Sequence, residues 1–220
     1  MRGQVILLVL FFYKKMEHKI ILASNSPRRK ELLAGLDIPF EVKTIAGLDE
    51  SFPDNLQGGE IPLFLSEKKS DAYESLWKED NTMVITSDTI VWVATEDAKG
   101  KMLGKPKSHE QAFEMLRLLS GKTHQVFTGV CVRTKDKKIS FVSCSDVKFS
   151  ELSDDEINHY IEKYKPYDKA GSYGVQEWIG YIAVEKITGS FYNIMGLPVH
   201  QLYKVLKSTF SSYIHPNQNC

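Results

Sequence analysis

The chemically most suggestive residues lie between positions 24 and 30, where the sequence reads Ser-Asn-Ser-Pro-Arg-Arg-Lys. An apolar run precedes this stretch, and a leucine-rich helical pattern follows it. Ser26 is a favourable N-cap, and Pro27 suits the first helical position because no backbone donor is needed there. Arg29 stands where Glu or Gln would complete a capping box, and it is one of three consecutive cations at the positive end of the helix dipole. A bound anion would make the interaction of these cations with the helix N-terminus favourable, so the stretch predicts a polyphosphate site.

Asp88 is the one acidic residue in the apolar run 83–93. An ionised carboxylate inside such a strand is costly unless a metal ion or a cationic side chain compensates it. The functional interpretation is therefore a general base or a metal-linked carboxylate. The alternative is an aspartate at a strand end or sheet edge that points into water.

Two lysines and two acidic residues are further candidates. Lys105 lies in a Gly-Lys-Pro turn, where a lysine can bind a phosphate as a point charge. Lys69 lies on a predicted helix, where a lysine is usually just solvated. Asp49 and Glu50 belong to an acidic, turn-rich segment. Either could reach a divalent cation, and a solvated loop explains them equally well.

Two glycine-bounded loops could complete a binding site. Residues 167–176 read Tyr-Asp-Lys-Ala-Gly-Ser-Tyr-Gly-Val-Gln, a composition that could stack on and hydrogen-bond a planar base. A purely structural loop is the alternative. Residues 189–198 form a second such loop, which either supports the site or only caps the last helix.

Composition limits the classes of function. The 220 residues are enough for one domain with a substantial core. Equal numbers of basic and acidic residues, 28 of each, argue against a general nucleic-acid or membrane-surface binder. Cys131 and Cys144 lie in strand-like runs without CxxC spacing. They are interpreted as small buried residues of a protein in the reduced cytoplasm rather than as zinc ligands.

The chain is predicted to have three parts: an N-terminal extension (1–15) outside the fold, a folded domain (16–210) and a flexible tail (211–220). The extension contains an apolar run from Val5 to Tyr13, which is too short to span a bilayer. No small-residue cleavage site follows it, as a signal peptide would require. A membrane tether is the alternative interpretation.

The order of predicted elements indicates an α/β fold with a mixed, twisted sheet flanked by helices. Hydrophobic periodicity, caps and turn residues delimit the elements. The predicted strands are 19–23, 40–45, 83–93, 102–103, 123–133, 139–149 and 181–187. The predicted helices are 27–36, 61–76, 108–119, a helix opened by the capping box at 153–156 and stopped by Pro166, and 199–207.

These segments resemble the Maf family of nucleotide pyrophosphatases. The resemblance runs from Ile20 to about Leu206 and rests on six segments in the same order: 22–29, 87–89, 104–106, 120–126, 168–176 and 196–198. It implies a cytoplasmic enzyme that hydrolyses nucleoside triphosphates to the monophosphate and pyrophosphate with a divalent metal cation, Mg²⁺ or Mn²⁺. It also implies a fold like that of Maf proteins and inosine triphosphate pyrophosphatases, with two lobes around a cleft, and in many members a homodimer.

The resemblance also implies roles for individual residues. The catalytic aspartate falls on Asp88 and its acidic partner at the metal on Glu50, with Asp49 as the alternative. The phosphate-binding residues fall on Ser24, Arg28, Arg29, Lys69 and Lys105. The positions that distinguish subgroups hold Arg28, Thr89 and Gln176, a combination similar to the dTTP/UTP-hydrolysing subgroup. The amide of Gln176 can donate and accept hydrogen bonds at once, as a pyrimidine edge requires.

Three positions depart from the family pattern. Asn25 and Ser87 stand where small Gly or Ala residues are frequent, and Glu177 stands where Gly is usual. A carboxylate at position 177 could narrow the base pocket or repel phosphate.

The resulting hypothesis is that Asp88 takes a proton from a water that attacks the α-phosphorus. A divalent cation would bridge the triphosphate, Asp88 and Glu50, and the cationic residues would stabilise the departing pyrophosphate. The alternative from another class is a non-enzymatic regulator of cell division that binds a nucleotide or a partner. A nucleotidyl transferase would need an acceptor other than water.

Overall fold

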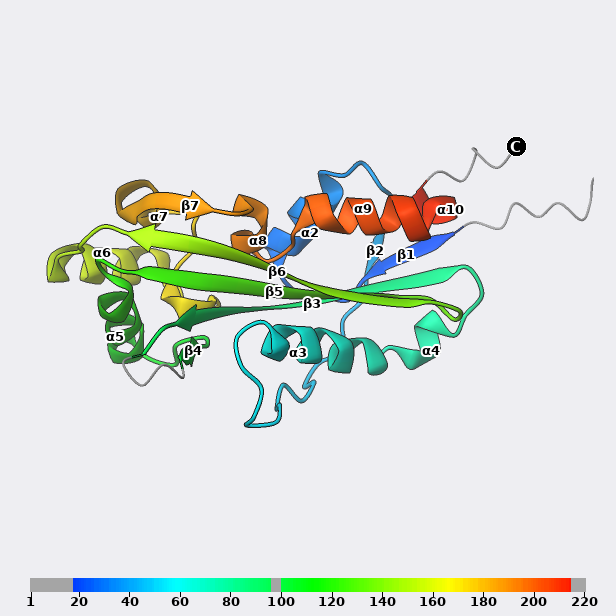
Figure 1. The fold of residues 1–220 in the computed structure, drawn as a ribbon, viewed down its shortest axis with the longest axis horizontal. Coiled ribbons are helices and arrows are strands. Elements are labelled where there is room, and N and C mark those ends of the chain that lie inside the picture. The colour runs from blue at the N-terminus through cyan, green and yellow to red at the C-terminus, as the bar shows by residue number, and fades with distance from the viewer. Residues whose placement is uncertain (1–17, 96–99, 215–220) are drawn as a thin grey trace, which may run out of the picture.

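A computed structural model describes residues 18–95 and 100–214; the predicted extension at 1–15 lies outside the described residues. The described chain forms one seven-stranded sheet in the order β2-β1-β3-β5-β6-β7, with β4 paired to the end of β3 (Figure 1). The strands are β1 (Lys19–Leu22), β2 (Glu41–Val42), β3 (Thr82–Val93), β4 (Lys101–Leu103), β5 (Thr123–Arg133), β6 (Lys138–Phe149) and β7 (Val184–Thr188). The helices are α2 (Pro27–Ala34), α3 (Glu60–Asp71), α4 (Glu74–Trp77), α5 (His109–Leu119), α6 (Asp154–Tyr164), the 3₁₀ helix η1 (Ala170–Ser172), α7 (Trp178–Ala183), α8 (Phe191–Met195), α9 (Val199–Thr209) and α10 (Ser211–Ile214).

Strand β3 joins the parallel and the antiparallel parts of the sheet. Its first residues pair in parallel with β1, and most of its length pairs antiparallel with β5. Strands β5 and β6, predicted at 123–133 and 139–149, form an antiparallel hairpin from the pair Thr123–Lys148 to the pair Arg133–Lys138. The sheet is therefore mixed, which confirms the predicted α/β class. Strand β2 is shorter than predicted, because only Glu41 and Val42 pair with β1.

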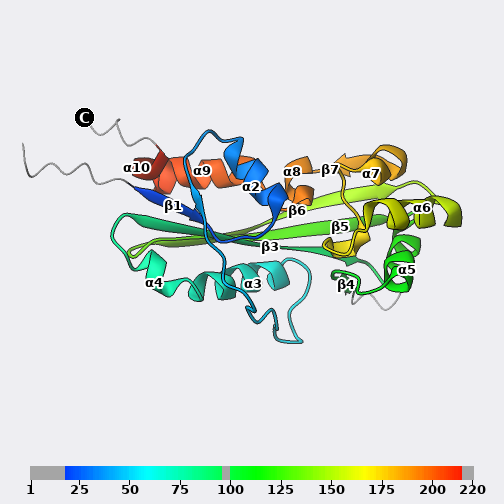
Figure 2. The ribbon, with the colours of Figure 1, turned by 180° about the vertical axis from the view of Figure 1, so that it is seen from behind.

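Helices cover both faces of the sheet, as the two opposite views show (Figures 1 and 2). On one face, Leu33 of α2 and Leu206 of α9 pack in a cluster with Ile85. On the other face, Trp77 of α4 packs in a cluster with Val84, the neighbour of Ile85 in β3. Successive strand residues point to opposite faces, so β3 is buried on both sides. This explains its nearly continuous apolar sequence and makes a carboxylate within it costly.

The predicted helix 61–76 is two helices, α3 and α4. The break falls at Tyr73, whose backbone has φ −101° and ψ 24°. The Tyr73 ring is buried, and its Oη accepts a hydrogen bond from the amide of Ile45 at 2.9 Å. The indole of Trp77 donates to the carbonyl of Ser70 at 3.0 Å. Tertiary contacts of two aromatic side chains thus override the helical periodicity.

The prediction is also wrong between residues 178 and 195. Helix α7 occupies the first part of the predicted strand 181–187, and β7 begins only at Val184. Gly180 explains the helix, because a Cβ there would lie 1.8 Å from the carbonyl oxygen of Val175; without it, α7 can lie against the preceding loop. The predicted loop 189–198 contains α8, whose N-cap Ser190 accepts a hydrogen bond from the amide of Asn193.

The chain after α9 continues as helix α10 where the sequence suggested a tail. Tyr213 and Ile214 pack against the cluster that contains Phe210. Within residues 18–95 and 100–214, no helix combines the length and apolar character needed to cross a membrane.

Candidate active site

The start of α2 has the local structure that the sequence predicts. Pro27 opens the helix, and Oγ of the N-cap Ser26 accepts a hydrogen bond from the amide of Arg29 at 3.4 Å. Oγ of Ser24 accepts one from the amide of Ser26 at 3.2 Å and so stabilises the turn before the helix. No acidic residue stands in the first turn of α2. The positive end of its dipole therefore has no carboxylate from its own helix.

Arg29 is held by the interior of the fold. Its Nε donates to the carbonyl of Gly196 and its Nη1 to the carbonyl of Ser87, both at 2.9 Å. Its Nη2 donates to Oγ1 of Thr89 at 3.1 Å, and that hydroxyl lies 2.9 Å from Oγ1 of Thr128. Burial lowers the pKa of Arg29, while the charge of Asp88 opposes this shift. Thr89, predicted as a specificity residue, thus contacts the guanidinium of Arg29.

Asp88 and Glu50 share one lysine. Nζ of Lys69 lies 2.6 Å from Oδ1 of Asp88 and 2.7 Å from Oε1 of Glu50. Burial raises the pKa of Glu50, but the Lys69 hydrogen bond and charge, with Lys105 and Arg29, outweigh it and hold that pKa below its ordinary value. Asp49, the alternative, pairs instead with Lys68 at 2.7 Å. The geometry therefore favours Glu50 as the partner of Asp88.

This pair fits the oxygen chemistry of a small divalent cation. Two carboxylates that converge on one ammonium group can also converge on a metal ion, and Mg²⁺ typically takes one or two carboxylates together with substrate phosphates and water. Across residues 18–95 and 100–214, no group of three or more His, Cys, Asp or Glu side chains is placed to hold a metal. A cation here would need ligands from the substrate.

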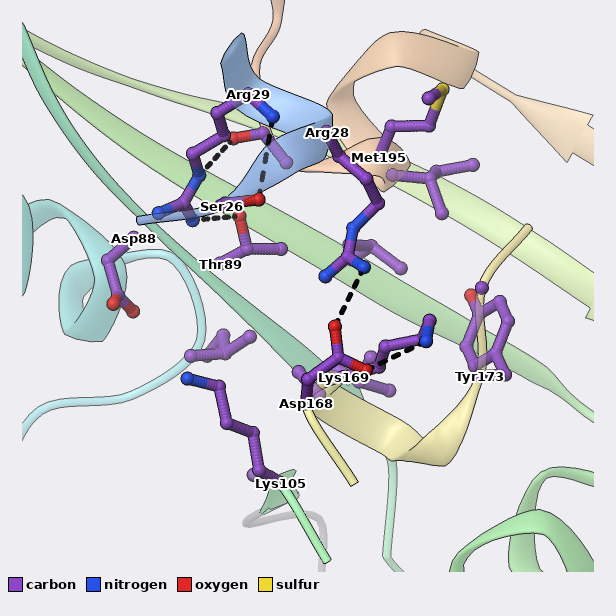
Figure 3. Close-up of a pocket in the computed structure, with 18 of the residues that line it drawn as sticks. Ser26, Arg28, Arg29, Asp88, Thr89, Lys105, Asp168, Lys169, Tyr173 and Met195 are labelled. Atoms are coloured by element: carbon purple, nitrogen blue, oxygen red, sulfur yellow. Dashed lines mark hydrogen bonds and ion pairs between the residues drawn. The ribbon is translucent and has the colours of Figure 1, made fainter. Parts of the chain in front are cut away.

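Two adjoining cavities meet at Glu50 and the arginines of α2. One, of about 290 Å³, has apolar residues such as Ile90 and Met195 in its wall together with charged side chains, among them Asp88, and with Gln176. The other, of about 420 Å³, is lined by the start of α2, residues 44–48, Lys69 and other polar groups. Six residues line both cavities: Ser26, Arg28, Arg29, Glu50, Lys105 and Asp168. Figure 3 shows the α2 arginines, Asp88 and Lys105 around this shared space.

An ion pair crosses the boundary between the cavities. Nη1 of Arg28 donates to Oδ2 of Asp168 at 2.9 Å, and Nζ of Lys169 donates to Oδ1 of the same carboxylate at 2.7 Å (Figure 3). Burial raises the pKa of Asp168, but Lys169 and Arg28 outweigh it and lower that pKa overall. The N-terminus of α2 is thus connected to the loop predicted to bind a base.

Gln176 lines the first cavity, and its Oε1 is buried without a hydrogen bond from any described residue. A buried acceptor without a donor is costly, so this atom is suited to a donor on a ligand. Glu177 does not line either cavity. Its carboxylate accepts a hydrogen bond from Tyr160 and pairs with Lys169 at 3.0 Å, so the structure corrects the expectation that it narrows the base pocket or repels phosphate.

Sequence reasoning missed several residues of the site. Asp168, Lys169 and Tyr173 line the first cavity, yet they were assigned no individual role. Lys169 is buried, which is unusual for a lysine and reflects its two carboxylate partners. The sequence contains the pair Asp168-Lys169 before a glycine-rich loop. Only the fold shows that Lys169 pairs with both Asp168 and Glu177.

His124 of β5 forms a hydrogen bond with Tyr173, a residue of the first cavity. The histidine is 1% exposed, and its Nε2 lies 2.8 Å from Oη of Tyr173. Its Nδ1 is buried without a hydrogen-bond partner among the described residues. Burial lowers the pKa of His124 to about 4 from 6.5, so the folded protein keeps this ring neutral.

We expect His124 to make stability depend on pH between about 6.5 and 4. The unfolded chain binds a proton near pH 6.5 and the folded state only near pH 4, so the free energy of unfolding falls as pH falls through this window, by about 3 kcal/mol in total. The His124→Gln variant lacks this titration. Urea unfolding of both proteins from pH 7 to 4 checks it, and parallel curves for the two would contradict the assignment.

Comparison with known proteins gives a consistent result. The family model described as Maf-like protein matches residues 19–209. The dTTP/UTP pyrophosphatases of Bacteroides thetaiotaomicron and Parabacteroides distasonis are each 56% identical over 191 residues, which cover 87% of this chain and 96% of those proteins. That of Flavobacterium johnsoniae is 46% identical over 193 residues, with 88% and 96% covered. A solved HAM1 protein from Coxiella burnetii aligns with a TM-score of 0.46 and 14% identity over 87% of this chain and 100% of that one. From the family match and these relatives, the chain belongs to the Maf family.

Proposed function

We propose that this protein is a nucleoside triphosphate pyrophosphatase that hydrolyses dTTP and UTP to the monophosphate and pyrophosphate. The observation that carries the proposal is the first cavity, whose lining brings together the arginines of α2, the buried Asp88 and Gln176. The names of the relatives, dTTP/UTP pyrophosphatase, support it.

The two cavities suggest how the substrate lies. The first has an apolar part of its wall, which includes Ile90, Val91 and Met195 and suits a base. The second collects hydroxyls, lysine and the start of α2, which suit phosphates. Arg28 and Lys105 belong to both and would bind the phosphates nearest the ribose. The α-phosphorus would then lie beside Asp88, where the cavities meet.

Asp88 would act as the general base for the attacking water. Lys69 pairs with this carboxylate at 2.6 Å, and Arg29 places a second positive charge nearby. Arg28, Lys105 and Lys69 would stabilise negative charge on the departing pyrophosphate. A divalent cation on Glu50 and Asp88 would supply Lewis-acid charge neutralisation for the phosphate oxygens.

Gln176 would select the base. Uracil and thymine present an N–H donor between two carbonyl acceptors, and an amide can accept from the first while it donates to a second. The free Oε1 of Gln176 is the acceptor that such an edge needs. Cytosine has an acceptor at the corresponding ring nitrogen, so an amide held in this one orientation would leave Oε1 unpaired, and we expect slower hydrolysis of CTP.

The direct test is product identification with Mg²⁺ and a panel of triphosphates. We expect dTTP and UTP to give pyrophosphate and the monophosphate in equal amounts, without orthophosphate. The assay must measure pyrophosphate and orthophosphate separately. No product from any nucleotide would contradict the proposal and favour the regulator, and pyrophosphate only in the presence of an added acceptor would favour the transferase.

A cytoplasmic location is part of the proposal. Cys131 is buried as predicted, whereas Cys144 is exposed, contrary to the prediction; both are free thiols, as in proteins of reducing compartments. A nucleoside triphosphate substrate agrees with that location.

A further inference from the structure

Glu177 is the centre of a set of contacts that ties together the start, middle and end of the loop 168–177. One carboxylate oxygen pairs with Nζ of Lys169 at 3.0 Å, and the other accepts a hydrogen bond from Oη of Tyr160. The Tyr160 oxygen in turn accepts a hydrogen bond from the amide of Gly174 at 3.0 Å. The turn closes with the amide of Glu177, which donates to the carbonyl of Gly174 at 2.9 Å.

The two partners of Glu177 are shielded from water, while the Glu177 side chain itself is 20% exposed. Tyr160 is 0% exposed and Lys169 is 8% exposed. Burial raises the pKa of Tyr160, and the Glu177 carboxylate raises it further, so the phenol keeps the proton that it donates. Charge-assisted hydrogen bonds in such a setting are stronger than surface ion pairs. The carboxylate therefore restricts the loop conformation far more than a solvated glutamate would.

Gly174 shows how closely the loop fits around this carboxylate. A Cβ at this position would lie 2.9 Å from Cδ of Glu177 and 3.1 Å from Cε of Lys169. A side chain at residue 174 would therefore force the carboxylate and the lysine apart. Gln176 lies in this turn between Gly174 and Glu177. It lines the first cavity, and its buried Oε1 has no hydrogen-bond partner among the described residues.

Ion pairs connect Lys169 to Arg28 in the first turn of α2, where the phosphates are proposed to bind. Lys169 also binds Asp168, and Asp168 binds Arg28 (Figure 3). Positive and negative groups thus alternate from Arg28 through Asp168 and Lys169 to Glu177. Without the Glu177 charge, Lys169 has a single carboxylate partner, and the base loop and the Arg28 side chain lose their common restraint.

We propose that Glu177 is a positioning residue that fixes the Gln176 amide toward the pyrimidine and couples the base loop to Arg28. It acts without touching the substrate, because it lines neither cavity. The inference rests on the proposed function, since it concerns how that site selects its base. It predicts that loss of the carboxylate weakens binding and selectivity more than the chemical step.

The experiment measures kcat and KM for UTP, dTTP and CTP in the full-length wild type, Glu177→Ala and Glu177→Gln. We expect Glu177→Ala to raise KM for UTP and dTTP by about 10–100-fold and to lower the preference for UTP over CTP, with kcat changed by less than about threefold. The Gln side chain can still accept one of the two hydrogen bonds, so Glu177→Gln should recover part of the affinity. The preference for UTP over CTP is a ratio within one preparation and is independent of the folded fraction.

Two further variants separate positioning from folding. Gly174→Ala keeps every charged group and displaces the carboxylate, so it should change KM in the same direction as Glu177→Ala. Glu162→Ala removes an exposed glutamate from the helix that carries Tyr160 and should leave KM unchanged. Wild-type KM and base preference in both Glu177→Ala and Gly174→Ala would overturn the inference. A wild type that makes no pyrophosphate would instead overturn the proposed function.

Discussion

Replacing Asp88 with asparagine should lower kcat for dTTP by about 10²–10⁴-fold, the usual contribution of a positioned general base. The fold should remain, because asparagine has nearly the same shape and the carboxylate is paired at one edge only, with Lys69 at 2.6 Å. Lys69 keeps its second partner, Glu50, at 2.7 Å. The buried amide would lack the charge needed to accept a proton from water.

The matched control is Asp80→Asn. Asp80 lies on the surface before β3 and pairs with Lys135 at 2.9 Å, away from both cavities. Its replacement should leave kcat at the parent value. Turnover is measured as pyrophosphate release under saturating dTTP and Mg²⁺, with thermal unfolding as the check on folding. An Asp88→Asn protein that turns over at the rate of Asp80→Asn would refute the role of the base.

Replacing Lys69 with methionine should lower kcat/KM by about 10²-fold or more, because a charge that acts on the reacting phosphates is lost. It should also move the acid limb of the pH profile upward. Burial raises the pKa of Glu50, and Lys69 is the main group that overcomes this and holds it low. Without Lys69, Glu50 loses the hydrogen bond and the charge that lower its pKa, so Glu50 takes up a proton at a higher pH than in the wild type.

The sign of this shift is the informative part. In the wild type the pKa of Glu50 lies below its ordinary value of 4.5, so the Glu50 carboxylate stays ionised into mildly acid solution. In Lys69→Met the loss of activity on acidification should begin at a higher pH. Lys69→Arg keeps the charge and should restore the acid limb even where its shape reduces kcat.

Lys68→Met serves as the control for Lys69→Met. Lys68 is the neighbouring residue on α3, but it binds Asp49 and Ser51 and lines neither cavity. Profiles of kcat/KM from pH 4 to 8 at constant ionic strength make the comparison. If the acid limbs of Lys69→Met and Lys68→Met both coincide with that of the wild type, Lys69 does not hold the pKa of Glu50 low.

Short-range features of this protein are determined by the sequence itself. The start of α2 follows from Ser26 and Pro27, and α6 begins at a capping box in which Ser153 and Glu156 satisfy each other. The hairpin of β5 and β6 follows from two apolar runs and the short turn between them. All of these depend on groups close together in the chain, so composition and spacing are sufficient. Asp88 also stands out from sequence alone, because a charge in a doubly buried strand needs compensation.

The tertiary structure decides which groups compensate these charges. Lys69 reaches Asp88 and Glu50 because α3 lies against β3, and no local pattern separates it from the adjacent Lys68, which binds Asp49 instead. Arg29 meets the carbonyl of Gly196 across 167 residues, and Arg28 meets Asp168 across 140. Glu177, a departure from the family pattern that the sequence alone connects with the base pocket, binds Tyr160 and Lys169 instead. Such contacts depend on how helices and loops pack on the sheet, a balance of many long-range interactions, whereas local propensity acts only over a few neighbouring residues.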